Sequence, residues 1–223
     1  MRSQPAVLSS LAAALVEDGR YAEASSLLDK TEFVSGEGET SVLETFRKAH
    51  IGLARQHQQA GRHAQAADEF LRATDYPHNL GVGRPAMESQ AREYVMAARE
   101  LEAAGKPKEA DALWRRAADE PLHSPTEPGE PWSEHYYYKA LALDHINHKE
   151  EARTLYTRLA ALHDDQQMQA AEPDPPKGPI RYLLAGLGLK ALGQNAAARS
   201  ALERSLTLDP NSALSKTALE ELK

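Results

Sequence analysis

One arrangement of large, small and turn-forming residues recurs five times along this chain of 223 residues. In the last copy, a large residue is followed by a small one, another large one, a turn glycine, a second small residue, a third large residue and a closing proline. These positions are Tyr182, Gly186, Leu189, Gly193, Ala198, Leu202 and Pro210. The recurrence indicates a fold built from equivalent units, because self-similarity at a steady period is the sequence signature of repeat architectures.

The arrangement resembles the tetratricopeptide repeat, a helix–turn–helix unit of about 34 residues. One unit cannot bury its apolar face alone, so copies stack into a solenoid. The resemblance implies an all-α fold, a right-handed α-solenoid of about five such repeats with a capping helix over residues 212–223. The repeats are expected near residues 5–33, 47–77, 91–121, 133–163 and 179–210. Because a continuous solenoid has no internal boundary, we expect residues 1–223 to form a single domain.

Two positions in every copy hold only alanine or glycine. The ten residues are Ala12, Ala54, Ala98, Ala140 and Gly186 in the first halves, and Ala24, Ala66, Ala110, Ala152 and Ala198 in the second halves. A larger side chain where two helices cross would force their axes apart, at a cost of about 1–3 kcal/mol. These positions therefore predict the crossing point of each helix pair. The alternative, a generic alanine-rich bundle, gives no reason for the pairing to repeat.

The copies also differ from the minimal repeat. Asn147 replaces the turn glycine in the fourth copy, and asparagine tolerates the left-handed backbone that such a turn needs. The copies begin about 42 to 46 residues apart, so extra residues lie between one copy and the next. Glycine and proline in these stretches predict breaks between helices. The stretches are 35–38, 76–85, 120–131 and 172–179.

The overall composition excludes several classes of protein. The formal net charge is −7, whereas binding to nucleic acid draws on clustered Lys and Arg, so we expect no nucleic-acid partner. No apolar stretch approaches the ~20 residues of a membrane span, and no signal peptide is visible, so we expect no membrane partner. Cysteine is absent, which removes disulfides and thiolate metal sites and fits a cytoplasmic protein.

A second resemblance concerns the stretch from Tyr76 to Pro85, which lies outside the repeat pattern. It is similar to a linker in the C-terminal repeat segment of a family of large bacterial proteins. The stretches 136–143 and 150–153 resemble the same segment. Those proteins carry a β-rich, carbohydrate-enzyme-like domain of unassigned function before the repeats. The resemblance implies a helical module attached to a catalytic or sugar-binding domain that this chain lacks.

Several residues invite a catalytic or metal-binding interpretation, and each has a simpler one. His50 and His57 fall at large-residue positions of the repeat, so we expect packed core histidines. His145 and His148 flank a turn and have no evident third ligand for a metal. The stretch 163–165, His-Asp-Asp, falls at a helix end, where solvated charge is the ordinary explanation. Residues 81–84, Gly-Val-Gly-Arg, can offer N–H groups to an anion, but no strand precedes them. We therefore predict no catalytic residue, no metal and no cofactor.

The resemblance also implies a concave face, lined by the first helix of each repeat, on which a partner binds. The residues expected there include four cations, called here the basic strip, namely Lys48, Arg55, Arg92 and Arg99. They also include an apolar patch of Tyr137, Leu141, Ile180, Leu183 and Leu187. The alternative is that the strip is merely solvated and that the patch packs on a neighbouring domain or on the cap helix.

These observations predict a non-catalytic scaffold that binds a protein or peptide, or an upstream domain of the same polypeptide, through its concave face. A second hypothesis is an accessory module of a larger carbohydrate-active enzyme, which docks on a catalytic domain absent from this chain. A third, an independent hydrolase that uses the histidines, would require bound metal.

Overall fold

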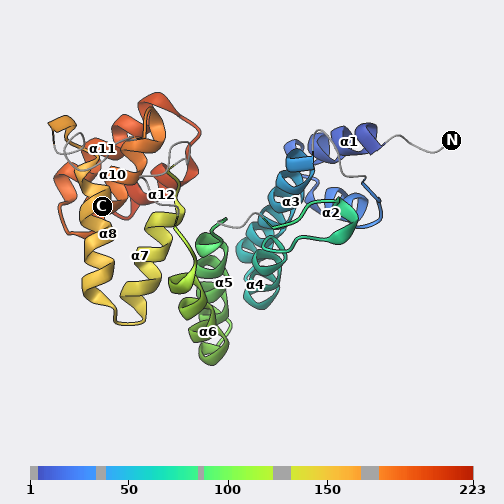
Figure 1. The fold of residues 1–223 in the computed structure, drawn as a ribbon, viewed down its shortest axis with the longest axis horizontal. Helices are drawn as coiled ribbons and strands as arrows, with labels where there is room; N and C mark the ends of the chain where they lie inside the picture. Colours follow the sequence, from blue (N-terminus) through green and yellow to red (C-terminus); the bar gives the residue numbers. More distant parts are fainter. Residues whose placement is uncertain (1–4, 34–38, 85–87, 123–131, 167–175, 223) are drawn as a thin grey trace. The chain divides into compact units, whose positions relative to one another are not determined.

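The computed structural model describes residues 5–33, 39–84, 88–122, 132–166 and 176–222. Within these segments every regular element is a helix (Figure 1). The first six α-helices are α1 (Pro5–Glu17), α2 (Tyr21–Asp29), α3 (Glu39–Gln59), α4 (His63–Arg72), α5 (Ala91–Ala103) and α6 (Pro107–Asp119), with a short 3₁₀ helix η1 (His78–Leu80) between α4 and α5. The others are α7 (His135–His145), α8 (Lys149–Ala161), α10 (Pro179–Ala191), α11 (Asn195–Leu208) and α12 (Ala213–Glu220).

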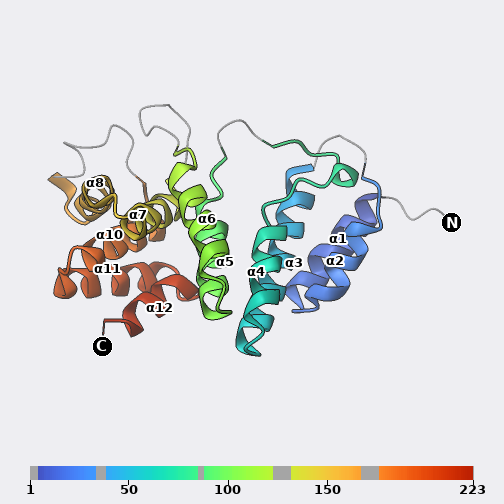
Figure 2. The same ribbon diagram turned by 90° about the horizontal axis from the view of Figure 1, so that it is seen from below.

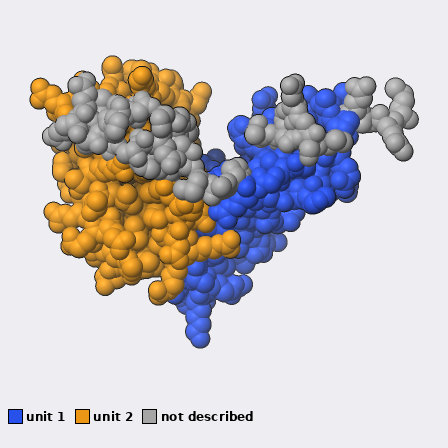
Figure 3. Space-filling view, in the orientation of Figure 1, with its two compact units in different colours: residues 1–113 blue, residues 114–223 orange. Residues whose placement is uncertain are grey.

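The chain divides into two compact units, residues 1–113 and residues 114–223 (Figure 3). The boundary falls inside α6, between Leu113 and Trp114. The single domain of residues 1–223 stays a prediction.

The helices pack in the order that a repeat array requires. Within the first unit α1 packs on α2 and α3 on α4, and within the second unit α7 packs on α8 and α10 on α11 (Figures 1 and 2). Three second helices also contact the first helix of the following pair, namely α2 with α3, α4 with α5, and α8 with α10. The predicted all-α helical-repeat fold is therefore confirmed, and each unit is a stretch of α-solenoid.

The small residues lie where the repeat pattern predicted. All ten are buried, from Ala12 and Ala24 in the first pair to Gly186 and Ala198 in the last. A β-carbon built on Gly186 would lie 2.5 Å from Cγ of Leu202 on the facing helix. That separation is shorter than any ordinary carbon–carbon contact, so the two helices approach too closely at this point for a side chain.

The turn inside each pair has the same backbone conformation in all five copies. The turn residue has a positive φ, between 67° and 75° at Gly19, Gly61, Gly105 and Gly193, and 69° at Asn147. This left-handed conformation is costly for most residues and accessible to glycine and asparagine. Asn147 stands at the position of the turn glycine, and the turn is preserved there, as predicted.

The second pair begins earlier than the repeat pattern predicted. Helix α3 starts at Glu39, whereas the copy was expected to begin near Arg47. The additional turns bury Val42, Leu43 and Phe46 against Leu28 of α2. The apolar spacing of these three residues supports a helix on its own, although they lie outside the repeat register.

The stretch after α4 is more than a break between helices. Leu80 of η1 is buried in the core of the first unit, with Leu28 and Phe33. The Nδ2 of Asn79 donates hydrogen bonds to the carbonyl oxygens of Leu28 and Thr31, each at 2.8 Å. This stretch therefore closes the end of α2. The expected break at 35–38 lies outside the described residues, as do residues 123–131 of the break expected at 120–131 and residues 172–175 of the break expected at 172–179.

The predicted capping helix is α12. Ser212 precedes it and accepts a hydrogen bond from the backbone N of Ser215 at 3.3 Å, which is an N-cap contact. Ala218 packs against Leu183, Leu187 and Leu202 of the last pair. Lys216, Thr217 and Glu220 are exposed on the other side of the helix, so α12 covers the last pair with a polar surface.

Candidate protein-binding surface

The four cations of the basic strip lie on two first helices of the first unit. Lys48 and Arg55 are seven residues apart on α3, and Arg92 and Arg99 have the same separation on α5. Seven residues make about two helical turns, so each pair lies along one side of its helix. Lys48, Arg55 and Arg99 are exposed, whereas Arg92 is half-buried.

Two of these cations have acidic neighbours on their own helices. The Nζ of Lys48 lies 2.6 Å from Oε1 of Glu44, and Nη2 of Arg92 lies 2.6 Å from Oε1 of Glu93. Arg55 and Arg99 form no ion pair with any residue that the structure describes. The uncompensated positive charge of the strip is therefore concentrated on these two guanidinium groups.

A hydrogen bond joins the two helices close to Arg55 and Arg99. The Nε2 of Gln58, one turn after Arg55, donates to Oε1 of Glu100, the residue next to Arg99, at 2.6 Å. The other oxygen of Glu100 lies 2.8 Å from Nδ1 of His63 at the start of α4. Glu100 is buried and both of its oxygens are occupied. These contacts hold α3 and α5 together at the level of the two arginines.

Two leucines of the apolar patch pack on the cap helix, which is one of the two alternatives left open by the sequence. Leu183 and Leu187 are only 5% and 1% exposed, because they pack beneath α12 with Leu202 and Ala218. A partner cannot reach these two leucines unless α12 is displaced. Tyr137 and Leu141 on α7 are half-buried, and Tyr137 packs against the same cluster.

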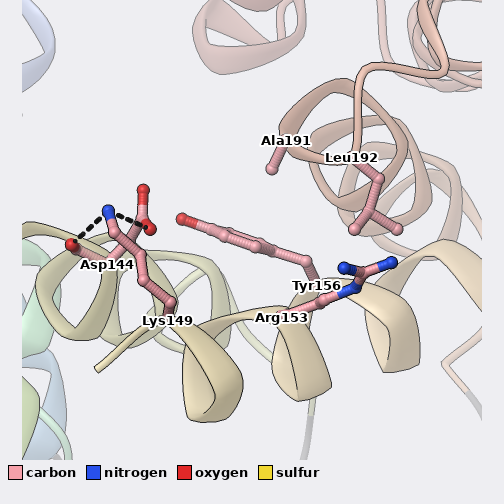
Figure 4. A pocket seen from close by; sticks show the side chains of 6 residues that line it. All are labelled: Asp144, Lys149, Arg153, Tyr156, Ala191 and Leu192. Atoms are coloured by element: carbon pink, nitrogen blue, oxygen red, sulfur yellow. Dashed lines mark hydrogen bonds and ion pairs between the residues drawn. The ribbon is translucent and has the colours of Figure 1, made fainter. Parts of the chain in front are cut away.

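A hollow of about 350 Å³ lies in the second unit, between the start of α8 and the end of α10 (Figure 4). Its lining residues are Asp144, Lys149, Arg153, Tyr156, Ala191 and Leu192. The Nζ of Lys149 donates to Oδ1 and to the backbone O of Asp144, at 2.8 and 2.9 Å. The Tyr156 ring lies across the hollow with its hydroxyl toward this pair. The hollow is open, its lining mixes polar and apolar side chains, and sequence reasoning did not single it out.

Sequence reasoning also missed a polar cluster of Arg47, Tyr76 and Glu88. Arg47 donates to the hydroxyl of Tyr76 at 2.7 Å, and both residues donate to the carboxylate of Glu88. Burial, reinforced by the hydrogen bond to Glu88, raises the pKa of Tyr76 to about 12. The tyrosine is therefore a neutral donor at ordinary pH and unsuited to act as a base. Two of the three residues lie between copies, where the repeat pattern gives no signal.

His50 and His145 serve as packing residues, and His50 also forms hydrogen bonds. His50 is buried, as predicted, with Nδ1 2.6 Å from Oε2 of Glu69 and Nε2 3.4 Å from Oγ of Ser25. Serine, histidine and a carboxylate are the residue types of a hydrolase triad, but here Ser25 and His50 lie in the core between helices. His145 stacks on Trp114, with ring centroids 4.1 Å apart. Across the described segments, no group of three or more His, Cys, Asp or Glu residues could hold a metal ion.

The fold and this surface define a helical-repeat scaffold. Residues 5–30 and 48–72 match the family model of the tetratricopeptide repeat, so these two segments are tetratricopeptide repeats. These segments cover the α1/α2 pair and most of the α3/α4 pair. Repeats of this family are generally non-catalytic scaffolds that bind proteins or peptides.

Comparison with other proteins also finds structural similarity. No curated protein matches the sequence significantly. Among solved structures, the chain is similar to YrrB, described as a TPR protein with an unusual peptide-binding site, at 16% sequence identity and a TM-score of 0.36. The match covers 96% of this chain and 90% of that one. In the segments that the structure describes, no helix has the length and apolar character needed to cross a bilayer.

Proposed function

We propose that this chain is a non-catalytic scaffold that binds an acidic protein segment along α3 and α5, on the concave face. The observation that supports the proposal is the equivalence of Arg55 and Arg99. They occupy the same position in consecutive first helices, both are exposed, and neither has an ion-pair partner among the described residues. The proposal covers a segment of a separate protein and a segment of an upstream domain of the same polypeptide.

The charge of the chain makes this surface selective. The formal net charge is −7, so most of the protein repels an acidic ligand, whereas the basic strip attracts it. A local field of opposite sign steers association and raises its rate. Lys48 and Arg92 contribute less, because a ligand carboxylate must compete with Glu44 and Glu93 for them. An acidic segment that follows Arg55 and Arg99 therefore gains the largest favourable interaction.

The remaining apolar residues have a smaller part in the proposal. Tyr137 and Leu141 on α7 stay candidates for an apolar contact with a partner, because both are half-buried and not fully covered. Leu183 and Leu187 act indirectly, since they support the cap helix α12. The acidic character of the ligand is thus the primary expectation, and apolar contacts are secondary.

The test compares the wild-type chain with the double charge reversal Arg55→Glu/Arg99→Glu. The probe is a fluorescent oligoglutamate peptide, and its association rate and affinity are measured at low and high salt. Wild type should bind with an affinity that falls as salt rises, because exposed charges are screened within about 8 Å at physiological ionic strength. The double variant should associate more slowly, on the order of tenfold or more.

Lys30→Glu/Lys108→Glu is the matched control. Both lysines are exposed in the same unit, neither belongs to the basic strip, and the change in net charge is identical. If the control variant weakens binding as much as the strip variant, the effect comes from net charge and the proposed site is wrong. If the affinity for the peptide changes neither with salt nor with the double charge reversal, the basic strip does not bind the ligand and the proposal is wrong.

A further inference from the structure

We propose that the exposed face of α1 binds the same face of a second copy of this chain. Val7 and Leu11 are 60% and 48% exposed, and Ala14 is exposed one turn further along the helix. These residues are four and three positions apart, so they form one apolar face. Glu17 is the only charged residue in the whole of α1. A surface helix with so little charge is unusual, because solvent-facing positions are ordinarily polar.

The last repeat shows what this face does elsewhere in the array. Counting from the start of each copy, Val7, Leu11 and Ala14 correspond to Arg181, Ala185 and Gly188 of α10. Arg181 donates through Nε to the carbonyl oxygen of Leu162 at 2.8 Å, and this oxygen belongs to the preceding pair. A β-carbon on Gly188 would lie 2.7 Å from the backbone N of Ala160 on α8. The equivalent face of α10 is thus the stacking face toward the preceding repeat.

Each of the three middle repeats also has a residue at one of these positions that contacts the preceding pair. Gln56 of the second copy donates to the carbonyl oxygen of Gly19, Glu100 of the third pairs with His63, and Lys139 of the fourth donates to the carbonyl oxygen of Glu120. In each case the acceptor or partner belongs to the preceding pair. In each of these four repeats, therefore, at least one of the three equivalent positions contacts the preceding pair. On α1 they hold apolar residues that are exposed.

Charge favours a second copy meeting α1 through α1 itself. Two copies each carry a formal net charge of −7, so they approach best where the surface carries least charge, and α1 is such a surface. Helix α12 is less suited to pair with this apolar face, because it presents Lys216, Thr217 and Glu220 to solvent. A contact of like with like is also the commonest symmetry of soluble oligomers, the two-fold dimer.

The residues of α1 suit an antiparallel pair. With the two-fold axis near Leu11, Val7 of one copy faces Ala14 of the other, so a larger residue meets a smaller one. Glu17 of one copy then lies near the N-terminus of its partner's helix. The first turn of α1 contains no acidic residue, and the positive end of the helix dipole favours an approaching carboxylate.

The experiment measures the molar mass of the full chain over a range of concentrations by light scattering and sedimentation. Wild type should shift from monomer to dimer as concentration rises. Leu11→Lys places a charge in the contact and should keep the chain monomeric, with unchanged helicity. Leu208→Lys is the control, since Leu208 is 46% exposed on α11 and lies far along the chain from α1. This control should dimerise as wild type does.

A second measurement uses the absence of cysteine in the native sequence. Ser10→Cys, on the exposed face of α1 near the proposed axis, should form a disulfide-linked dimer on mild oxidation. Ser200→Cys, exposed on α11, should not. A wild-type chain that stays monomeric at every concentration, or a Leu11→Lys variant that still dimerises, overturns the proposal.

Discussion

Arg47 donates through Nη2 to Oε2 of Glu88 at 3.0 Å, although the two residues are 41 positions apart in the sequence. The contact joins α3 to the segment that leads into α5. Tyr76 completes the cluster, and the Arg47 guanidinium lies 5.1 Å from the centroid of its ring. A charged pair is thus held at half-buried positions by a third, neutral group, which makes the stability of this region sensitive to alkaline pH.

The first prediction follows from the pKa of Tyr76. Its value of about 12 in the folded protein lies above the ordinary value of about 10. Between these values the folded chain keeps a proton that the unfolded chain has lost, so the contribution is complete below pH ~10 and is lost as pH rises toward ~12. Urea unfolding across this range should show a steeper loss of stability for wild type than for Tyr76→Phe. If the free energy of unfolding fell equally with pH in wild type and in Tyr76→Phe, the raised pKa of Tyr76 would be contradicted.

The second prediction concerns two glycines of α10. A β-carbon on Gly188 would lie 2.7 Å from backbone atoms of α8, which cannot move aside, whereas one on Gly186 would meet mainly the side chain of Leu202. Alanine ordinarily favours a helix over glycine by about 1 kcal/mol. Gly188→Ala should nevertheless lower the free energy of unfolding by about 1–3 kcal/mol through overpacking. Gly186→Ala should cost less, and the opposite order in chemical denaturation would show that α8 and α10 pack differently.

The third prediction tests the turn at Asn147. Its φ of 69° matches the turn glycines of the other copies. Asn147→Ala should lower stability by about 1–2 kcal/mol, because alanine tolerates the left-handed conformation poorly. Asn147→Gly should stay close to wild type. Thermal unfolding of the two variants provides the measurement, and two equal melting temperatures would mean that the turn is not under this constraint.

The fourth prediction concerns Asn79. Asn79→Asp keeps the size of the side chain but removes the donor to the carbonyl oxygens of Leu28 and Thr31. Leaving these acceptors without their partner should cost about 1–3 kcal/mol. Hydrogen exchange should become faster in α1 and α2, while α10 and α11 keep their protection. His78→Ala, at the exposed neighbouring position, is the control and should leave exchange in α2 unchanged.

The repeat pattern predicted those features that depend on one helix pair alone. The crossing alanines, the turn at Asn147 and the capping helix all follow from local spacing, because each is fixed by residues within a few turns of one another. The early start of α3 was missed, since Val42 and Phe46 serve a core contact outside the repeat register. The packing of Leu80 was missed for a similar reason, because nothing near it in the sequence shows that it reaches α2.

The candidate site shows the same limit. The positions of Arg55 and Arg99 within the repeat predicted that both lie outside the core, and both are exposed. The position of a residue within the repeat does not show which neighbouring element packs on that face of the helix. Leu183 and Leu187 have the spacing of a surface patch, yet α12 covers them, as one of the two alternatives had allowed. Likewise, the pairing of Arg92 with Glu93 depends on side-chain conformation, which spacing does not specify.

The contact of Asn79 with α2 has a mechanical consequence. In an array linked only through successive neighbours, a pulling force can peel helices away from one end in turn. Here the stretch that leaves α4 returns to the end of α2, where the backbone N of Phe33 also donates to the carbonyl oxygen of Asn79 at 2.7 Å. Under tension, the first pair is therefore held by the exit of the second as well as by α3. The two pairs should therefore unfold together under a pulling force, in one step and not in two.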